Sequence, residues 1–482
     1  MNFALDVVER ADPQARALVE LTRGGDRRTW TFGEAAQRSG ALAGALLAAG
    51  ATRGDVVLTL IGNRPEWVFT MVACFRIGAV VLPCTEQLRA KDLRLRLDAV
   101  APRVVVADER NRAVLEEALT GRAEQPAVLT IPDEALYEHP APPAAVLADD
   151  DPCLITFTSG TAGEPKAVVH AQRYLAGQRL QAEHWLAPRA GELVWCTAAS
   201  GWSKSARNVF IAPWVRGAAG LLHDARFDPA ERLELLERER VDVLCMAPTE
   251  YRIIAKRTTL RRFERLHGLV AAGEALNPEV LAAWREATGL DVRDGYGQTE
   301  TGQMTANPPG VAAEPGSMGL PLPGVRMWIE DGELLVDPAT VPTFFLGYRG
   351  EPEHDRATPW RTGDRVAQDE RGYLHFEGRA DDVIISAGYR IGPFEVESAL
   401  VSHPAVAEAA VVAAPDDERG SVVRAIVVLR DGDAPGDALA RELQDHVKAQ
   451  TAPYKYPRIV EFRDELPKTT SGKIRRALLR DE

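Results

Sequence analysis

Short apolar runs alternate with helical patterns through the first two-thirds of the chain, and this alternation constrains the fold more than any other feature. Between residues 56 and 83 the expected order is strand, helix, strand, over Val56–Ile61, Glu66–Ile77 and Ala79–Pro83. Further apolar runs follow at Val104–Ala107, Ala127–Ile131, Leu154–Thr158 and Val243–Ala247. The pattern predicts an α/β fold of layered subdomains with largely parallel sheets. A chain of 482 residues is too long for one core, so at least two lobes are expected.

The texture of the sequence changes from about Gly316, where glycine and proline recur and short strands are expected around Glu333–Val336 and Tyr373–Phe376. The C-terminal part has the pattern of a separate small α+β unit. Its expected elements are a helix opened by Pro393, strands at Ala409–Ala413 and Val422–Leu429, and a helix near Asp437–Gln450. The boundary falls close to Arg379–Asp382, which predicts a large domain over residues 1–379 and a small one over residues 380–482.

The net charge and the cysteines of the chain indicate which classes of partner and which cellular compartment to expect. The formal net charge of −13 argues against a nucleic acid or an anionic membrane as partner, because either requires a basic face. Five scattered cysteines without C-x-x-C spacing are typical of reduced thiols in a cytosol. No signal-peptide pattern opens the sequence, and no apolar run reaches the ~18 residues of a membrane span. A cytoplasmic enzyme is therefore expected, and the sequence leaves a homodimer open.

A loop rich in glycine and hydroxyl groups follows the apolar run that ends near Thr158. Its residues are Thr158-Ser159-Gly160-Thr161-Ala162-Gly163-Glu164-Pro165-Lys166. Glycines let backbone N–H groups point inward, hydroxyls add donors, and a lysine closes the loop, so the segment describes a phosphate cradle. It is not a Walker loop, which needs Gly-Lys-Ser/Thr leading into a helix. Alone, such a loop is more often a plain turn.

Five motifs occur along the chain in a fixed order: Thr158–Lys166, Tyr296–Gly302, Arg361–Asp364, Gly378–Arg390 and Pro467–Lys473. In this order they resemble the acyl/aryl-CoA synthetases, adenylation domains and luciferases, over essentially the whole chain. The chain looks closest to the medium-chain acyl-CoA synthetase branch, through Ser386–Pro393 and Ala452–Arg458. The resemblance implies an AMP-forming acid–CoA ligase, with a β-barrel-like part in the large domain and a mobile small domain. One departure is Ala162, where the family usually has Thr or Ser.

The resemblance implies roles for the residues of the adenylation site. Lys473 would bridge the substrate carboxylate and the α-phosphate, Thr299 would bond that phosphate, and Glu300 would hold Mg²⁺, which prefers oxygen ligands. Tyr296 would stack on adenine, and Asp364 would bind the ribose with support from Arg379. The remaining ATP-binding residues implied by the resemblance are Thr158, Ser159, Gly160, Thr161, Gly163, Lys166, Gly273, Glu274, Ala275, Asp294, Gly297 and Gln298.

The second half-reaction needs coenzyme A, whose phosphates require basic groups despite the acidic whole chain. By resemblance the CoA-binding residues are Ala387, Gly388, Tyr389, Arg390, Arg419, Lys448, Tyr456 and Arg458. Asp381 corresponds to the hinge about which the small domain of this family turns between the two half-reactions.

The identity of the acid is less constrained. Acetate-specific relatives close the acid pocket with a tryptophan at the position of Gly297, and glycine has no side chain to do so. An acid longer than acetate, medium-chain or aromatic, is therefore expected. Trp202 suits an apolar or aryl substrate, whereas Lys204 and Arg207 could either face solvent or meet a second carboxylate. The sequence does not choose between these two readings.

Three other functions compete. An adenylating enzyme could load a carrier-protein thiol or an amine instead of CoA, although no carrier domain is recognised in the chain and the CoA-type residues disfavour this reading. A non-catalytic nucleotide- or acyl-CoA-binding protein would be expected to lose Lys473 or Glu300, and both are present. A luciferase-like oxygenase is not excluded by the motifs alone.

Overall fold

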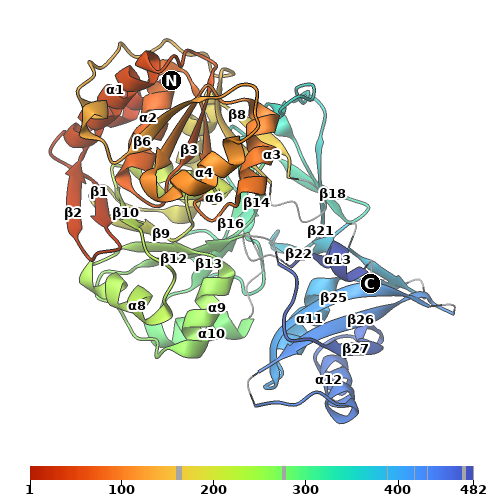
Figure 1. Cartoon of the computed structure of the whole chain (residues 1–482). Coiled ribbons are helices and arrows are strands. Elements are labelled where there is room, and N and C mark those ends of the chain that lie inside the picture. Colours follow the sequence, from red (N-terminus) through yellow and green to blue (C-terminus); the bar gives the residue numbers. More distant parts are fainter. Residues whose placement is uncertain are drawn as a thin grey trace. The chain divides into compact units, whose positions relative to one another are not determined.

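A computed structural model of the chain describes residues 1–158, 165–273, 278–380, 382–387, 389–416, 418–430, 432–468 and 474–480, without the side chain of Arg390. The chain divides into two units (Figure 1). The N-terminal unit comprises Met1–Thr158, Lys166–Arg326 and Asp337–Thr358. The C-terminal unit is built mainly from Met327–Val336 and Pro359–Glu482. The four-stranded sheet described below therefore belongs with the C-terminal unit.

The first large sheet of the N-terminal unit has seven strands. Their order is β20 (Gly347–Tyr348), β8 (Ala167–Ala171), β7 (Pro152–Phe157), β4 (Val80–Cys84), β3 (Val56–Leu60), β5 (Val104–Asp108) and β6 (Ala127–Ile131). Strands β3 to β7 run parallel, while β8 is antiparallel to both β7 and β20. Strands β3, β4 and β5 are buried along their whole length, as continuous apolar runs predict for parallel strands. Helices α3 (Ala90–Val100) and α4 (Arg112–Leu119) pack on one face.

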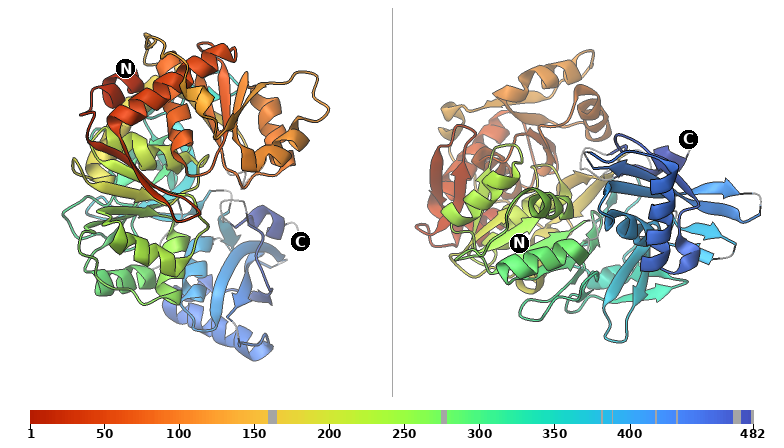
Figure 2. Two further views of the ribbon diagram at one scale, coloured as in Figure 1. Left: turned by 60° about the vertical axis from the view of Figure 1, so that its left-hand side comes forward. Right: turned by 90° about the horizontal axis from the view of Figure 1, so that it is seen from below.

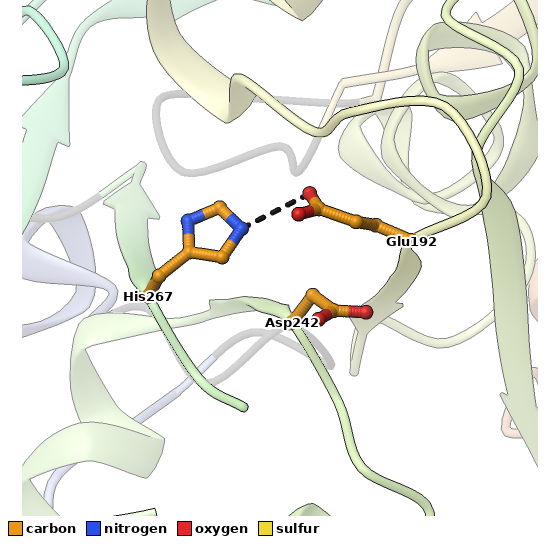
Figure 3. A group of neighbouring side chains, drawn as sticks. All are labelled: Glu192, Asp242 and His267. Atoms are coloured by element: carbon orange, nitrogen blue, oxygen red, sulfur yellow. Dashed lines mark hydrogen bonds and ion pairs between the residues drawn. The ribbon is translucent and has the colours of Figure 1, made fainter. Parts of the chain in front are cut away.

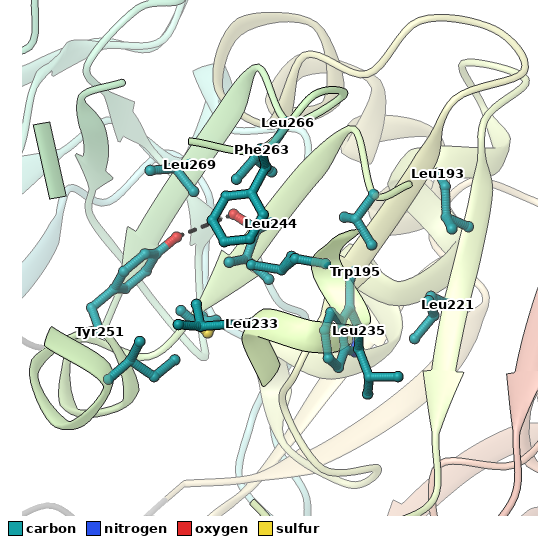
Figure 4. Packing of buried hydrophobic residues seen from close by; sticks show 14 of the residues in the cluster. Leu193, Trp195, Leu221, Leu233, Leu235, Leu244, Tyr251, Phe263, Leu266 and Leu269 are labelled. Carbon is teal, nitrogen blue, oxygen red and sulfur yellow. Dashed lines mark hydrogen bonds between the residues drawn. The ribbon is translucent and has the colours of Figure 1, made fainter. Parts of the chain in front are cut away.

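The second large sheet also has seven strands. Their order is β13 (Val292–Gly295), β12 (Gly268–Ala272), β11 (Val243–Met246), β9 (Leu193–Cys196), β10 (Ala219–His223), β1 (Arg16–Leu21) and β2 (Arg27–Thr31). All pairs are parallel except β1 with β2. Three helices, α8 (Pro229–Arg238), α9 (Pro248–Arg257) and α10 (Pro278–Thr288), contribute side chains to the core on one face (Figure 4). There the buried Tyr251 hydroxyl donates to the carbonyls of Leu244 and Val270, 3.2 Å from each.

Other helices of this unit form where caps and aromatic contacts favour them. Helix α1 (Phe32–Ala48) begins with a capping box between Thr31 and Glu34. Helix α2 (Pro65–Ile77) has proline at its first position and ends at Gly78, which has a φ of 74°. The ring of Trp67 on α2 lies 6.0 Å from that of Phe210 in η5 (Arg207–Ile211), and Phe210 in turn contacts Trp214 of α7 (Ala212–Trp214). Helix α5 (Gln172–Gln181) follows β8.

The carboxyl ends of strands from both sheets meet. Asn63, after β3, accepts from the backbone N–H of Ser200, after β9, at 2.8 Å and donates to the carbonyl of Ala198 at 3.3 Å. Gly201 has a φ of 91°, and a Cβ there would lie 2.4 Å from the backbone nitrogen of Thr85, so this approach requires glycine. In open parallel sheets, ligands bind beyond the carboxyl ends of the strands. The N-terminal unit therefore presents a binding region at this edge.

The C-terminal unit contains three antiparallel or mixed sheets. The first consists of β18 (Met327–Glu330), β19 (Glu333–Val336), β21 (Trp360–Gln368) and β22 (Leu374–Arg379). A hairpin pairs β23 (Ile384–Ser386) with β24 (Tyr389–Ile391). The third sheet consists of β25 (Val406–Asp416), β26 (Gly420–Leu429) and β27 (Ile459–Phe462).

Both faces of the β25–β26–β27 sheet are covered (Figure 2). Alternate side chains such as Val411 and Ala425 pack with α11 (Pro393–Val401) and α12 (Asp437–Gln450). Their neighbours Val412 and Ile426 pack on the other face with Leu479 of α13 (Arg476–Arg480). The period of two places successive residues on opposite faces, and here both faces are apolar.

The predicted fold class is confirmed: the chain has an α/β part with largely parallel sheets and a smaller α+β C-terminal part. The bounds of β6, β19 and α12 are those that the sequence predicts. Helix α8 is rich in charged residues and amphipathic. Leu233, Leu235 and Leu236 are buried in the core. No helix in the described part of the chain has the length and hydropathy needed to cross a lipid bilayer.

Candidate active site

The described motif residues of the N-terminal unit lie at the carboxyl ends of its strands. Thr158 follows β7, Gly273 follows β12, Tyr296 follows β13, and Trp202 lies beyond β9. Because parallel strands present these ends at one edge of a sheet, motifs that are far apart in sequence reach the same region.

The base of the glycine-rich loop is closed by two hydrogen bonds between its first and last residues. The backbone N–H of Thr158 donates to the carbonyl of Lys166 at 3.0 Å, and the N–H of Lys166 donates to Thr158 Oγ1 at 2.9 Å. The Lys166 ammonium lies 3.1 Å from Glu351 Oε1 and 4.4 Å from the centre of the Tyr348 ring. These two hydrogen bonds therefore hold the first and last residues of the loop, Thr158 and Lys166, next to each other.

A short hairpin carries Thr299 and Glu300. It pairs β14 (Gly297–Gln298) with β15 (Gly302–Gln303), and a Cβ on Gly297 would lie 1.8 Å from the carbonyl oxygen of Gly302. The Tyr348 hydroxyl donates to Glu300 Oε1 at 2.8 Å. Among the described residues no basic side chain forms an ion pair with Glu300, so its carboxylate can serve a cation. A carboxylate oxygen of this kind fits Mg²⁺, which prefers hard oxygen ligands.

Backbone contacts fix the strand that precedes this hairpin. Asp294 Oδ1 accepts from the N–H of Gly295 at 2.8 Å, and the Asp294 carbonyl accepts from the side chain of Asn307 at 3.1 Å. Burial raises the pKa of Asp294 to about 8, against the opposing effects of the Gly295 N–H and the charge of Lys204. The backbone N–H of Tyr296 donates to Thr305 Oγ1 at 3.1 Å. Asp294 is therefore mostly protonated at neutral pH.

In the C-terminal unit the structure brings Asp364 and Arg379 together. Arg379 Nη1 lies 2.9 Å from Asp364 Oδ1 and also donates to the carbonyl of Thr362 at 3.1 Å. Asp364 is buried. Since β21 and β22 are adjacent antiparallel strands in which Asp364 and Arg379 are paired, the sheet register itself sets this contact.

The described CoA-type residues form two groups. In the first, the N–H of Ala387 donates to the carbonyl of Arg419 at 3.0 Å, and the Tyr389 ring stacks on Tyr454 with centroids 4.3 Å apart. In the second, Lys448 Nζ lies 4.4 Å from the centre of the Tyr456 ring, and Arg458 Nη1 donates to the Tyr456 hydroxyl at 2.9 Å. Cations and exposed aromatic rings thus occur together, as binding a nucleotide with phosphates requires.

The ends of the segment that carries the predicted catalytic lysine are anchored. Lys468 and Ile474 form an antiparallel bridge, and the N–H of Arg475 donates to the carbonyl of Pro467 at 2.9 Å. Arg476 binds both oxygens of the Glu397 carboxylate, with Nη2 at 2.9 Å from Oε1 and 2.7 Å from Oε2.

The segment expected to border the acid contains one buried cation. Trp202 and Lys204 are half-buried, whereas Arg207 is only 5% exposed. Lys204 Nζ donates to the carbonyl of Ala272 at 3.2 Å, at the carboxyl end of β12. Of the two readings left open by the sequence, a solvent-facing Arg207 is wrong.

Several predicted site residues lie outside the described part of the chain. They are Ser159, Gly160, Thr161, Gly163, Glu274, Ala275, Asp381, Gly388, Lys473 and the side chain of Arg390.

Two residues in contact with predicted site residues were missed by sequence reasoning. Tyr348 binds Glu300, and its only signal is an aromatic residue between Gly347 and Gly350. Tyr454 stacks on Tyr389 and lies in the segment Ala452–Arg458 that carries part of the family resemblance. Tyr454 is 42% exposed.

Glu192, Asp242 and His267 form a cluster with the composition of a metal site, but their contacts connect strands of the second sheet (Figure 3). Each residue immediately precedes a strand, β9, β11 or β12, at the amino ends opposite the motif residues. Asp242 accepts from the N–H of Leu193 at 2.8 Å and pairs with Arg265 at 2.8 Å, and a His267 ring nitrogen lies 3.0 Å from Glu192. These contacts account for the cluster as a structural network.

Comparison with known proteins gives consistent matches over the whole chain. The sequence model of the AMP-binding enzyme family matches residues 5–342, and that of the AMP-binding enzyme C-terminal domain matches residues 395–473. The mitochondrial acyl-coenzyme A synthetase ACSM4 of Mus musculus is 40% identical, over 100% of this chain and 90% of its own. The acyl-CoA ligase YtcI of Bacillus subtilis is 39% identical, over 97% and 93%. The solved structure of the anthranilate CoA ligase AuaEII in complex with anthranoyl-AMP superposes with a TM-score of 0.89 at 29% identity, over 99% and 96%.

Proposed function

Because the chain belongs to the AMP-binding enzyme family and is an AMP-forming acid–CoA ligase, we propose that its motif residues serve the two half-reactions of that ligase. We also propose that its acid is medium-chain or aromatic. The acid and ATP give an acyl-adenylate and pyrophosphate, and the acyl group then passes to the thiol of CoA with release of AMP. The observation that carries the residue assignment is the Glu300 carboxylate, held by Tyr348 beside β14–β15 and free of basic partners among the described residues.

The first half-reaction brings two anions together. At ~4 Å two unit charges repel by about 4 kcal/mol at an effective dielectric of about 20. Glu300 would hold Mg²⁺, which neutralises charge on the triphosphate when it is bound. Thr158 and Lys166 would frame the β- and γ-phosphates, and Lys473 would bridge the acid and the α-phosphate. The protein thus places positive charge where the transition state accumulates negative charge.

The nucleoside is assigned to two of the motif residues. Tyr296 would stack on adenine, and Asp364 would accept hydrogen bonds from the two ribose hydroxyls. The 2.9 Å contact with Arg379 supports this role, because it fixes the orientation of a buried carboxylate.

The second half-reaction is assigned to the C-terminal unit. Lys448, Arg458 and the Tyr456 ring between them would bind the phosphates of CoA, and Tyr389 with Tyr454 would flank its organic part. We propose that residues 380–482 form the domain that changes orientation between the half-reactions, with its hinge at Asp381. Five free, buried cysteines support a reducing cytoplasmic setting.

The test is turnover by the purified protein with Mg-ATP and carboxylic acids from acetate to decanoate, together with benzoates. Release of AMP and pyrophosphate is measured with and without CoA. We expect release that requires both an acid and CoA, with a maximum at a medium chain length or an aromatic ring. Pyrophosphate exchange that ignores CoA would instead assign the protein to carrier-loading or amine-ligating enzymes. A maximum at acetate would contradict the proposed acid class.

A further inference from the structure

Two basic side chains lie three residues apart on the helical segment that follows β9. Lys204 belongs to α6 (Ser203–Ala206), and Arg207 opens η5, a π-helical turn that continues it. Residues at this spacing occupy one face of a helix, and π-helical turns recur at functional sites. Lys204 reaches the carbonyl of Ala272 at the end of β12, and Arg207 reaches the position beside Gly302.

Arg207 is buried without a counter-charge. Its side chain is only 5% exposed, and neither Nε nor Nη1 has a hydrogen-bond partner in the part of the chain that the structure describes. Within the same described ranges no carboxylate pairs with it. Arg207 does form a side-chain hydrogen bond with Tyr174, but that phenol carries no charge. A buried guanidinium without a counter-charge is strongly unfavourable, so a native protein keeps one only where something else supplies the anion.

The neighbours of Arg207 cannot supply negative charge. His170 is fully buried, and burial together with the charges of Arg207 and Arg173 lowers its pKa to about 3, so the ring is neutral at pH 7. The Tyr174 ring lies 4.2 Å from the His170 ring, and burial raises the pKa of its phenol, which therefore stays neutral.

Geometry places both cations beside the residues proposed to activate the acid. Arg207 Nη1 lies 3.6 Å from the position of a Cβ on Gly302, the residue that closes the turn bearing Thr299 and Glu300. Lys204 Nζ lies 3.7 Å from the position of a Cβ on Gly273. At Gly273 the ammonium of Lys204 is the nearest neighbouring group, whereas at Gly302 the Thr343 hydroxyl, 2.8 Å from the same Cβ position, lies beside Arg207.

The carboxylate whose charge acts on Lys204 is itself mostly neutral. Burial raises the pKa of Asp294 to about 8, which leaves the group protonated at pH 7 even though Lys204 opposes the shift. Among the residues that the structure describes, no charged carboxylate forms an ion pair with Lys204 or Arg207, so this described region is positive at neutral pH.

We propose that the acid activated by this enzyme carries a second anionic group, a carboxylate in the simplest case, which Arg207 binds with the help of Lys204. The inference rests on the proposed function, since it names the substrate class of the same site. A planar carboxylate matches the fork of a guanidinium and accepts two parallel hydrogen bonds from it. The substrate would thus be a medium-length dicarboxylate or an aromatic acid with an anionic substituent, and binding would supply the counter-charge that Arg207 lacks among the described residues.

The test compares acids in matched pairs that differ only in the second carboxylate: hexanoate with adipate, octanoate with suberate, and benzoate with terephthalate. AMP release is followed at pH 7 with Mg-ATP and CoA, and binding of each acid to the protein is measured by calorimetry. We expect the dicarboxylate of at least one pair to have a kcat/KM about 10- to 100-fold above that of its monocarboxylate, the range of a hydrogen-bonded charge pair.

Variants separate recognition from folding. Arg207→Met should remove most of the preference for the dicarboxylate while monocarboxylate turnover persists, and Arg207→Lys should keep part of the preference. Arg112→Met, whose side chain is 73% exposed on α4, is the matched control and should change neither. If Arg207→Met fails to fold, the pairwise preference of the wild-type protein and its calorimetric binding still decide the question.

The outcomes distinguish the two proposals. Monocarboxylates that turn over well, with dicarboxylates rejected or weaker, would overturn the inference and leave the ligase function intact. An equal loss of both members of a pair in Arg207→Met would assign Arg207 to structure alone and would also overturn it. No AMP release with any acid would overturn the proposed function, and the inference with it.

Discussion

At the scale of single residues, one hydroxyl orients the carboxylate proposed to hold the metal ion. The Tyr348 hydroxyl donates to Glu300 at 2.8 Å, while the Tyr348 ring also lies under the ammonium of Lys166. Tyr348→Phe removes the hydroxyl and keeps the ring. Because such supporting hydrogen bonds are typically worth about 10- to 100-fold in metal affinity, the Mg²⁺ concentration for half-maximal adenylation should rise by at least about 10-fold. Pyrophosphate release measured against Mg²⁺ concentration checks this.

The control is Tyr373→Phe, a buried tyrosine in the C-terminal unit, which should leave the Mg²⁺ requirement unchanged. An unchanged requirement in Tyr348→Phe would contradict the role given to the hydroxyl. A rise in the KM for CoA with an unchanged Mg²⁺ requirement would do the same.

The contacts between residues of the candidate site could be predicted from the sequence only in part. Asp364 and Arg379 were paired correctly from the motif, because their strands are neighbours in sequence and pair antiparallel. The surroundings of Arg207 were not predictable, since His170 lies 37 positions earlier and Gly302 lies on another element. A sequence shows that a residue is charged, but the burial and missing partner of that charge depend on contacts between distant segments.

At the scale of elements, the periodicity of the sequence predicted where helices and strands begin and end better than it predicted which of their side chains are buried. The bounds of α12 and β19 follow from local patterns alone. Helix α8 carries many charged residues, yet Leu233 and Leu236 pack into the core of the second sheet, and even Arg232 is buried there over the Trp195 ring. A charge-rich helix can still bury one apolar stripe, and only its partner surface reveals how much.

The pair of Glu397 on α11 and Arg476 on α13 anchors the helix that follows the predicted catalytic lysine. Glu397 also accepts from the N–H of Val411 on β25, so the pair ties that helix to the sheet. Arg476→Met would leave the 9%-exposed Glu397 side chain without its cation. Breaking a buried pair in this way should destabilise the protein by about 3 kcal/mol, measured by chemical denaturation.

The exposed neighbour Arg475 supplies the matched control, because Arg475→Met should be nearly neutral. We also expect Arg476→Met to slow adenylation more than conversion of a supplied acyl-adenylate to the thioester. Equal stability of the two variants would show that the pair contributes nothing to the anchoring.

At the scale of the whole molecule, an acidic net charge is compatible with a small basic group such as the one proposed to bind CoA. A charge of −13 over 482 residues argues against a polyanionic partner, but Lys448 and Arg458 both lie beside the ring of Tyr456. Composition therefore constrains partners that need a large face, and it says little about a small ligand. The order of five motifs predicted the family, which no single motif could have done.

Alternation between two half-reactions is the property of the whole chain that can be tested most directly. Asp381 is the proposed hinge, and proline there would fix φ and restrict the preceding residue. In Asp381→Pro we expect adenylation to continue while thioester formation falls by about 10²-fold, because misplaced reacting groups typically cost that much. Pyrophosphate exchange reports the first step, and CoA-dependent release of AMP from supplied acyl-adenylate reports the second. Asp381→Ala, which keeps backbone freedom, should retain both.

Lys473→Ala should give the opposite pattern, and the two variants together separate a hinge from a general defect. Removal of one preorganised charge at the α-phosphate should cost about 10²–10³ in the rate of adenylation. Conversion of supplied acyl-adenylate should persist, because that step no longer joins a carboxylate to a phosphate. If Lys473→Ala lost both half-reactions equally, the lysine would not be specific to adenylation. If Asp381→Pro lost both half-reactions, the substitution would be a general defect and not a block of the hinge. If it retained both, the chain would need no change of orientation between the two steps.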